Sequence, residues 1–328
     1  MKSFKFISVN NPADAISLVD KNEQAAFLGG GTNLLDLMKE HVALPNEIID
    51  IGNLALKEIK STATGISLGA LAKNTATANH PLVRKNFPLL SKAILAGASA
   101  QIRNMATNGG NLLQRTRCSY FYDISMPCNK RKPGSGCAAI NGFNRMHAIF
   151  GWSDNCVAVY PSDMAIALSA LNSTVKVMGN NAERTIPFKD FHILPGNHPE
   201  KDNSLAHGEL ISAIEIPKNS FADHSAYIKV RDRNSYAFAL VSVAAGLNLN
   251  GNTIQSANIA MGGVAHKPWR AFQAEEFLKG KAATTANFSK AADTEMAAAK
   301  ALSHNKFKIE MGKKTLINAL EAAFRGNS

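Results

Sequence analysis

The first 52 residues alternate strand-like apolar runs with segments of helical periodicity, and this pattern predicts a βαβαβ lobe. The first helix is expected to begin at Pro12, because Asn11 can cap it and proline is favoured at the first helical position. This helix is expected to end near Asp20. The strands are predicted at residues 4–9, 25–28 and 47–51, and the second helix at residues 34–41.

Residues 53–217 are expected to form a second lobe of mixed helices and strands. Its polar stretch at 192–208 has the composition of a mobile lid or an exposed connector. The predicted elements are strands at 66–71, 173–178, 183–187 and 210–216, helices at 87–99 and 164–171, and a hairpin turn at Gly179, Asn180 and Asn181.

Residues 218–328 change in character, and we expect a separate C-terminal α+β domain there. From Trp269 onward the chain is rich in Ala, Lys and Glu, which predicts about three helices. The preceding strands are predicted at 225–231, 238–249 and 253–261, with the last two joined at Asn250 and Gly251.

The composition is that of an ordinary globular protein, with 45% hydrophobic and 19% charged residues in a chain of 328. No apolar run is long enough to span a bilayer, so we expect no membrane span. The net charge of +11 indicates an acidic partner, such as nucleic acid, a membrane surface, a phosphate-bearing cofactor or another subunit. The basic residues are spread along the chain without a dense run, which argues against nucleic acid.

Two turns rich in small residues have the chemistry to hold a phosphate. The turn at 29–33 (GGGTN) follows a predicted strand and opens a helix, where backbone amides favour an anion. It matches neither the dinucleotide fingerprint nor a P-loop, so a plain tight turn explains it equally well. The turn at 107–111 (TNGGN) also fits a hairpin, because Asn-Gly is a strong hairpin signal. Together, one in each lobe, the two turns could clamp a pyrophosphate.

All four cysteines of the chain lie in one segment, residues 115–156, and are separated by nine, eight and eighteen residues. The segment is rich in Gly, Pro, Asn and Ser, so we expect a long loop rather than a helix or strand. A loop of this length inside a compact domain usually has a function. The cysteines are Cys118, Cys128, Cys137 and Cys156.

Three interpretations of these cysteines compete. They could be structural cysteines, free or in disulfides; they could bind zinc, although no C-x2-C pair is present; or they could hold an iron–sulfur cluster, which tolerates varied spacing. Basic neighbours favour thiolate ligands by lowering the thiol pKa, and they would offset the charge of a cluster. They also fit a solvated or partner-facing surface. The charged residues from 115 to 145 are Arg115, Arg117, Lys130, Arg131, Lys132, Arg145 and one acid, Asp123.

These residues together resemble the FAD-binding (medium) subunits of the xanthine dehydrogenase/molybdenum hydroxylase family, most strongly the flavin and [4Fe-4S] subunits of bacterial periplasmic aldehyde oxidoreductases. The four-cysteine insertion is the most specific feature, because most flavin subunits of this family lack it. The segments that carry the resemblance are FLGGGTNLLDLMK, RNMATNGGNLLQRTRCSYFYD, PCNKRKPGSGCAA, YPSDMA, KVRDRNSYAFALVSVAA and GGVAHKPWR, spread over nearly the whole chain.

The resemblance implies an α+β fold: a two-lobed FAD-binding module of the vanillyl-alcohol-oxidase (PCMH) type over residues 1–217, with an iron–sulfur insertion at 115–156, and a CO dehydrogenase flavoprotein-like domain over 218–328. It implies a [4Fe-4S] cluster on Cys118, Cys128, Cys137 and Cys156. It implies that FAD is held by Ala26, Phe27, Leu28, Gly29, Gly30, Gly31, Thr32, Asn33, Leu34, Thr107, Gly109, Gly110, Asn111, Asp163 and Lys229.

The function that the resemblance implies is electron transfer in a heterotrimeric molybdenum-dependent aldehyde oxidoreductase. A large subunit would oxidise the aldehyde to an acid, and a small subunit would carry [2Fe-2S] clusters that lead electrons to FAD here and on to an external acceptor. No catalytic side chain is expected in this chain, because the flavin carries the chemistry. One alternative is the flavin subunit of a 4-hydroxybenzoyl-CoA reductase-like enzyme; another is a basic, cluster-stabilised protein that binds nucleic acid.

The chain begins without a hydrophobic signal segment, so we expect no signal peptide of its own. The resemblance implies a periplasmic location through co-export with a partner subunit; a cytoplasmic one is the alternative.

Overall fold

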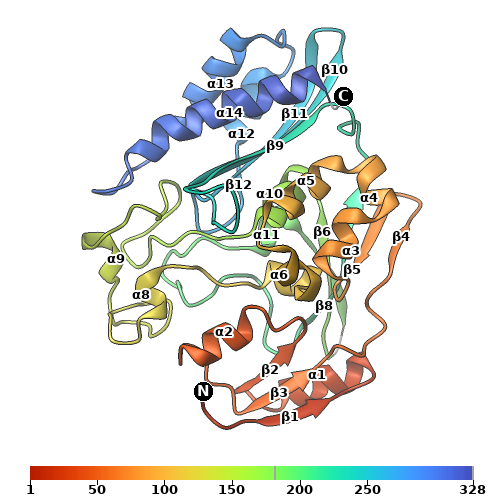
Figure 1. The fold of residues 1–328 in the computed structure, drawn as a ribbon, viewed down its shortest axis with the longest axis vertical. Helices are drawn as coiled ribbons and strands as arrows, with labels where there is room; N and C mark the ends of the chain where they lie inside the picture. Colours follow the sequence, from red (N-terminus) through yellow and green to blue (C-terminus); the bar gives the residue numbers. More distant parts are fainter. Residues whose placement is uncertain (181, 327–328) are drawn as a thin grey trace.

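The computed structural model describes residues 1–180 and 182–326, and it contains three separate sheets with helices packed against them (Figure 1). The N-terminal lobe lies at one end of the molecule and the C-terminal helices at the other, with the larger lobe between them (Figure 1). The predicted hairpin between residues 173 and 187 forms, although Asn181 at its turn lies outside the described residues.

The N-terminal lobe is the predicted βαβαβ unit, with a parallel sheet in the order β1-β3-β2. Asn11 caps the first helix as expected, since its side chain accepts a hydrogen bond from the Asp14 amide. Ile16 and Val19 of that helix pack on Ile49 of the central strand. The elements are β1 (Lys5–Ser8), α1 (Pro12–Asp20), β2 (Ala25–Leu28), α2 (Leu34–Lys39) and β3 (Glu47–Asp50).

The second lobe is built on a five-stranded sheet in the order β4-β5-β8-β6-β7. Its strands are β4 (Ile59–Ser61), β5 (Gly65–Gly69), β6 (Thr174–Met178), β7 (Glu183–Pro187) and β8 (Leu210–Pro217). Its helices are α3 (Asn74–Asn79), α4 (Pro81–Asn86), α5 (Pro88–Ala96), α6 (Ala100–Met105), α7 (Asn108–Leu112), α10 (Asp163–Ala170) and α11 (Phe188–Phe191). Every residue of α10 is buried, because this helix packs on α5 from one side and on the C-terminal sheet from the other.

The C-terminal domain is an antiparallel sheet in the order β12-β11-β10-β9, covered on one face by three helices (Figure 1). The predicted strand at 238–249 begins later than expected, because residues 238–240 precede the strand and Phe238 faces a cavity instead. The elements are β9 (Ser225–Val230), β10 (Val241–Asn250), β11 (Thr253–Gly262), β12 (Trp269–Arg270), α12 (Phe272–Leu278), α13 (Thr285–Met296) and α14 (Phe307–Arg325).

Residues 115–156, which we call the cysteine arm, extend from the side of the molecule between α2 and α14 (Figure 1). The arm contains only two short helices, α8 (Ser119–Tyr122) and α9 (Ala138–Asn141), so it is largely the loop that its composition predicted. Among the helices that the structure describes, none has the length and apolar character needed to cross a membrane.

Candidate functional site

The first glycine turn presses its backbone against the second lobe. A Cβ atom on Gly30 would lie 2.2 Å from the carbonyl oxygen of Met105, so only glycine fits there. Gly31 has a φ of 73°, in the left-handed region that favours glycine. The glycines therefore allow the two lobes to meet backbone to backbone, and the turn leads directly into α2.

The second turn is a helix start and not the hairpin that Asn-Gly suggested. Thr107 caps α7 by accepting a hydrogen bond from the Gly110 amide at 3.1 Å. Asn108 is buried, where its amide donates to the Gly69 carbonyl and its oxygen accepts from Thr77. These tertiary partners for Asn108 outweigh the local hairpin preference. The amides of Asn108 and Gly109 donate to the carbonyls of Ala72 and Ala70, so the start of α7 is bonded to the segment that follows β5.

A long groove runs from these turns towards the C-terminal domain. It consists of three cavities that share lining residues, of about 280, 600 and 370 Å³. The 280 and 600 Å³ cavities share Thr32, Asn33 and Gly110, at the junction of the two turns. The 600 and 370 Å³ cavities share Ser162 and Asp163 at the start of α10. The three cavities therefore form one continuous groove with the glycine turns at the first junction.

Two polar atoms on the wall of the 600 Å³ cavity are buried without a hydrogen-bond partner: Nδ2 of Asn33 and Nε of Arg103. The other end of the Asn33 side chain is held by the Arg115 amide, which donates to Oδ1 at 2.9 Å. Buried polar groups are normally satisfied, so unpaired donors at this place indicate a ligand that accepts hydrogen bonds. A pyrophosphate beside the glycine turns has that chemistry.

Asp163 and Lys229 form a buried ion pair, with Nζ of Lys229 2.8 Å from Oδ2 of Asp163. The hydroxyl of Tyr227 donates to the other carboxylate oxygen at 2.6 Å. Asp163 lines the groove, whereas Lys229 is not among the residues that line its three cavities and also bonds to the Ala96 carbonyl. Lys229 thus lies behind Asp163 and orients it. Direct contact of either residue with a cofactor stays a prediction.

The structure brings the other predicted groove residues together. Ala26 to Leu34 line the 280 Å³ cavity with Thr107, Gly109 and Gly110, and Asn111 lines the 600 Å³ cavity. The sequence reasoning missed part of the opposite wall. The polar run RDRNSY was the available signal that β9 ends in a loop before β10. The missed groove residues of that loop are Arg233, Tyr236, Ala237 and Phe238.

The cysteine arm gathers all four cysteines around one small cavity. Cys128 and Cys137 face each other across an antiparallel bridge, and none of the four is in a disulfide. Among residues 1–180 and 182–326, no group of three or more His, Cys, Asp or Glu side chains is placed to hold a single metal ion. The disulfide interpretation is therefore wrong for this structure, and the arrangement does not favour a mononuclear zinc site.

The basic neighbours do not make the thiols acidic, contrary to expectation. Burial raises the pKa of the Cys118 thiol to about 11 and that of Cys156 to about 12. Lys130 lowers the pKa of Cys156, but burial outweighs it. Four cations of the arm are instead paired with acids elsewhere in the chain: Arg115, Arg117, Lys130 and Arg145.

Asp202 is the main anchor of the arm. It accepts from Arg115 Nε at 2.7 Å and from the buried Lys130 ammonium at 2.5 Å, and Lys130 also donates to the Pro199 carbonyl. Burial alone would raise the pKa of Asp202, but Arg115 and Lys130 hold it at about 2. The stretch at 192–208 is therefore tied to the arm at Asp202, although it also has exposed residues such as those at 196–198.

Comparison with known families agrees with this architecture. Residues 2–219 match the family described as FAD binding domain in molybdopterin dehydrogenase, and residues 225–325 match the CO dehydrogenase flavoprotein C-terminal domain. The chain belongs to the FAD-binding medium subunits of the molybdenum hydroxylase family. It is therefore a flavoprotein subunit of an oxidoreductase, with the resemblance and the α+β fold class confirmed.

Relatives in this family span the whole chain. It is 47% identical to the aldehyde oxidoreductase FAD-binding subunit PaoB of Escherichia coli (strain K12), over 98% of this chain and 99% of that one. It is 26% identical to the glyceraldehyde dehydrogenase medium chain of Sulfolobus acidocaldarius, over 85% of this chain and 82% of that one. A chain of a solved carbon monoxide dehydrogenase of Hydrogenophaga pseudoflava has the same fold, with a TM-score of 0.78 and 24% identity. The match covers 99% of this chain and 98% of that one.

Proposed function

We propose that this chain is the FAD- and [4Fe-4S]-carrying electron-transfer subunit of a heterotrimeric molybdenum-dependent aldehyde oxidoreductase. The observation that carries the proposal is the long groove, with two glycine turns at its junction, in a chain 47% identical to an aldehyde oxidoreductase FAD-binding subunit. Bound in this groove, FAD would accept electrons delivered from a molybdenum subunit by [2Fe-2S] clusters and pass them to an external acceptor.

The residues of the groove fit FAD. The first glycine turn lets its backbone approach a pyrophosphate closely, and the Thr107 cap holds the start of α7 in place beside it. Asn33 and Arg103 would donate to its oxygens through Nδ2 and Nε. Lys229 and Tyr227 hold the Asp163 carboxylate in a single orientation at the other end of the groove. The chain thus supplies binding and orientation, and no side chain is needed to move a proton.

The cysteine arm supports the [4Fe-4S] part of the proposal through its donor set. Four cysteines free of disulfides line one cavity, which matches the four thiolates that such a cluster takes. A cluster places its metal atoms between the ligands, so its sulfur ligands stand further apart than those of a single ion. The raised pKa values of Cys118 and Cys156 imply that these thiols lose their protons only when metal binds.

The partners in this proposal are a large molybdenum-cofactor subunit and a small [2Fe-2S] subunit. Relatives described as medium chains or medium subunits support an assembly of this type. The net charge of +11 suits a chain that faces acidic partner surfaces. We propose a periplasmic location by co-export with a partner that carries the export signal.

An anaerobic absorption spectrum of the purified chain, with iron and acid-labile sulfide assayed on the same sample, tests both cofactors. We expect flavin bands together with about four iron and four sulfide per chain, the content of a cysteine-ligated cubane. Flavin without iron would leave the FAD module and overturn the cluster. Folded protein that holds neither cofactor would overturn the whole proposal.

A further inference from the structure

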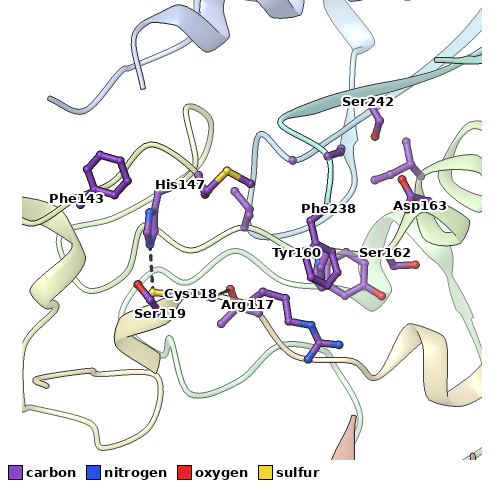
Figure 2. A pocket seen from close by; sticks show the side chains of 18 residues that line it. Arg117, Cys118, Ser119, Phe143, His147, Tyr160, Ser162, Asp163, Phe238 and Ser242 are labelled. Carbon is purple, nitrogen blue, oxygen red and sulfur yellow. Dashed lines mark hydrogen bonds between the residues drawn. The ribbon is translucent and has the colours of Figure 1, made fainter. Parts of the chain in front are cut away.

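His147 is placed so that its imidazole meets one cysteine sulfur. Nε2 of His147 lies 3.1 Å from Sγ of Cys118, a contact drawn as a dashed line in Figure 2. The other ring nitrogen, Nδ1, is buried and has no hydrogen-bond partner. The Cys118 sulfur is therefore the side-chain partner of this ring, while the backbone of Asn144 acts on the ring by raising the pKa of His147 against the larger lowering effect of burial.

The backbone around His147 is held by buried side chains of the C-terminal domain. Asn305 and Lys308 both donate to the His147 carbonyl, at 3.1 and 3.0 Å, and both are fully buried. Lys308 also donates to the carbonyl of Gly263, on the wall of the 370 Å³ cavity. These bonds fix the backbone of His147, and with it the point from which the ring reaches the Cys118 sulfur.

The contact lies between the two candidate cofactor sites. Cys118 lines both the small cysteine cavity and the 370 Å³ cavity of the long groove. In Figure 2, His147 and Cys118 stand on one side of that cavity, and Ser162 and Asp163 stand on the other. Cys118 is thus the cysteine that faces the groove, and His147 bonds to that particular sulfur.

We propose that His147 is a positioning residue that donates its Nε2–H to the Cys118 sulfur and thereby raises the reduction potential of the cluster held by the arm. A cysteine thiolate that ligates iron only accepts hydrogen bonds, so the nitrogen that faces it carries the proton. Reduction adds one electron and makes the sulfurs more negative, which strengthens the bond and favours the reduced state. No proton is transferred. This inference rests on the proposed function, because it requires the cluster.

The test is a potentiometric titration of the full chain with its partner subunits, followed by electron paramagnetic resonance. Replacing His147→Leu removes the donor, and we expect the equilibrium constant for cluster reduction to fall about tenfold, which is about 59 mV to more negative potential for one electron. His147→Gln keeps an N–H near the same position and should restore most of the potential. His192→Leu is the matched control, because His192 is also buried but bonds to the Leu112 carbonyl.

A second measurement needs no variant. In wild-type protein labelled with ¹⁵N-histidine, the reduced cluster should show a hyperfine coupling to one histidine nitrogen through the S···H–N bond. This measurement decides the question if the His147→Leu protein fails to hold a cluster.

An unchanged potential in His147→Leu, an equal shift in His192→Leu, or a wild-type cluster without the histidine coupling would each overturn the inference while the cluster stands. A wild-type chain with flavin but without iron or sulfide would instead remove the cluster on which the inference rests, and the assay of iron distinguishes the two cases.

Discussion

The long groove and the cysteine arm are held in shape by different forces. Around the glycine turns the groove is formed by backbone: Gly30 lies against the Met105 carbonyl, and helix α7 begins at a capped residue. The arm has little regular structure. Its last residues pack into the C-terminal core through Ile149 and Phe150, whereas its earlier part is attached by side chains such as Lys130, which pairs with Asp202. We therefore expect the groove to lose FAD affinity when its backbones are forced apart. We expect the arm to open when a buried charge that holds it is removed.

The largest effect is expected from Asp202→Ala, which leaves the Lys130 ammonium buried without its acid. Removing one partner of a buried ion pair typically costs about 3–5 kcal/mol. We expect the arm to open and its iron to be lost, while flavin stays bound in the groove. The measurement is the reaction rate of the buried thiols Cys128 and Cys156 with a thiol reagent after iron is removed. This rate should be on the order of 100-fold higher in Asp202→Ala than in the wild-type chain.

Asp232→Asn is the matched control for this change. Asp232 pairs with Arg145 of the same arm, but both side chains are substantially exposed. Exposed ion pairs contribute about 0–1 kcal/mol, so thiol reactivity should change less than about fivefold. Equal effects of the two variants would show that the buried anchor is not what closes the arm.

A smaller effect, confined to the groove, is expected from Gly30→Ala. The added Cβ would meet the Met105 carbonyl oxygen at 2.2 Å, and overpacking typically costs about 1–3 kcal/mol. We expect FAD affinity to fall up to about 100-fold while the iron content is unchanged, as measured by flavin retention during dialysis. Gly179→Ala is the control, because the nearest atom to its Cβ lies at 3.4 Å. Loss of iron in Gly30→Ala would show that a change in the groove also disrupts the cysteine arm, and would contradict the separation of the two regions.

The smallest effect is a dependence on pH that belongs to the arm alone. The pKa of Asp202 is about 2 in the folded chain, lower than the ordinary value of about 3.9. Its folded pKa is depressed, so it stabilises the fold above about pH 4, by an amount on the order of 2 kcal/mol that is lost as pH falls towards 2. Thiol reactivity of the wild-type arm should rise over that range and approach that of Asp202→Ala. If thiol reactivity rose with falling pH in the same way in both proteins, Asp202 would not be the group responsible for the pH dependence.

The two regions also differ in how far they could be predicted. Strand and helix periodicity, the Asn11 cap and the glycine turn at 29–33 act over a few residues, so the N-terminal lobe follows from local pattern. The anchor of the arm joins Arg115 and Lys130 to Asp202, which are 87 and 72 residues apart. No local signal marks such a pair, and the polar stretch that contains Asp202 was expected to be a lid or a connector.

By itself, the sequence determined the α+β fold class, the family and the elements whose period or caps are local, because backbone preference and side-chain spacing act at short range. Only the tertiary structure decided that four dispersed cysteines line one cavity, that Lys229 lies behind Asp163, and that Asn108 begins a helix. Each of these outcomes depends on burial and on partners far away in the chain. Burial also reversed the expected direction of the thiol pKa values, because desolvation of Cys118 and Cys156 exceeds the effect of nearby cations.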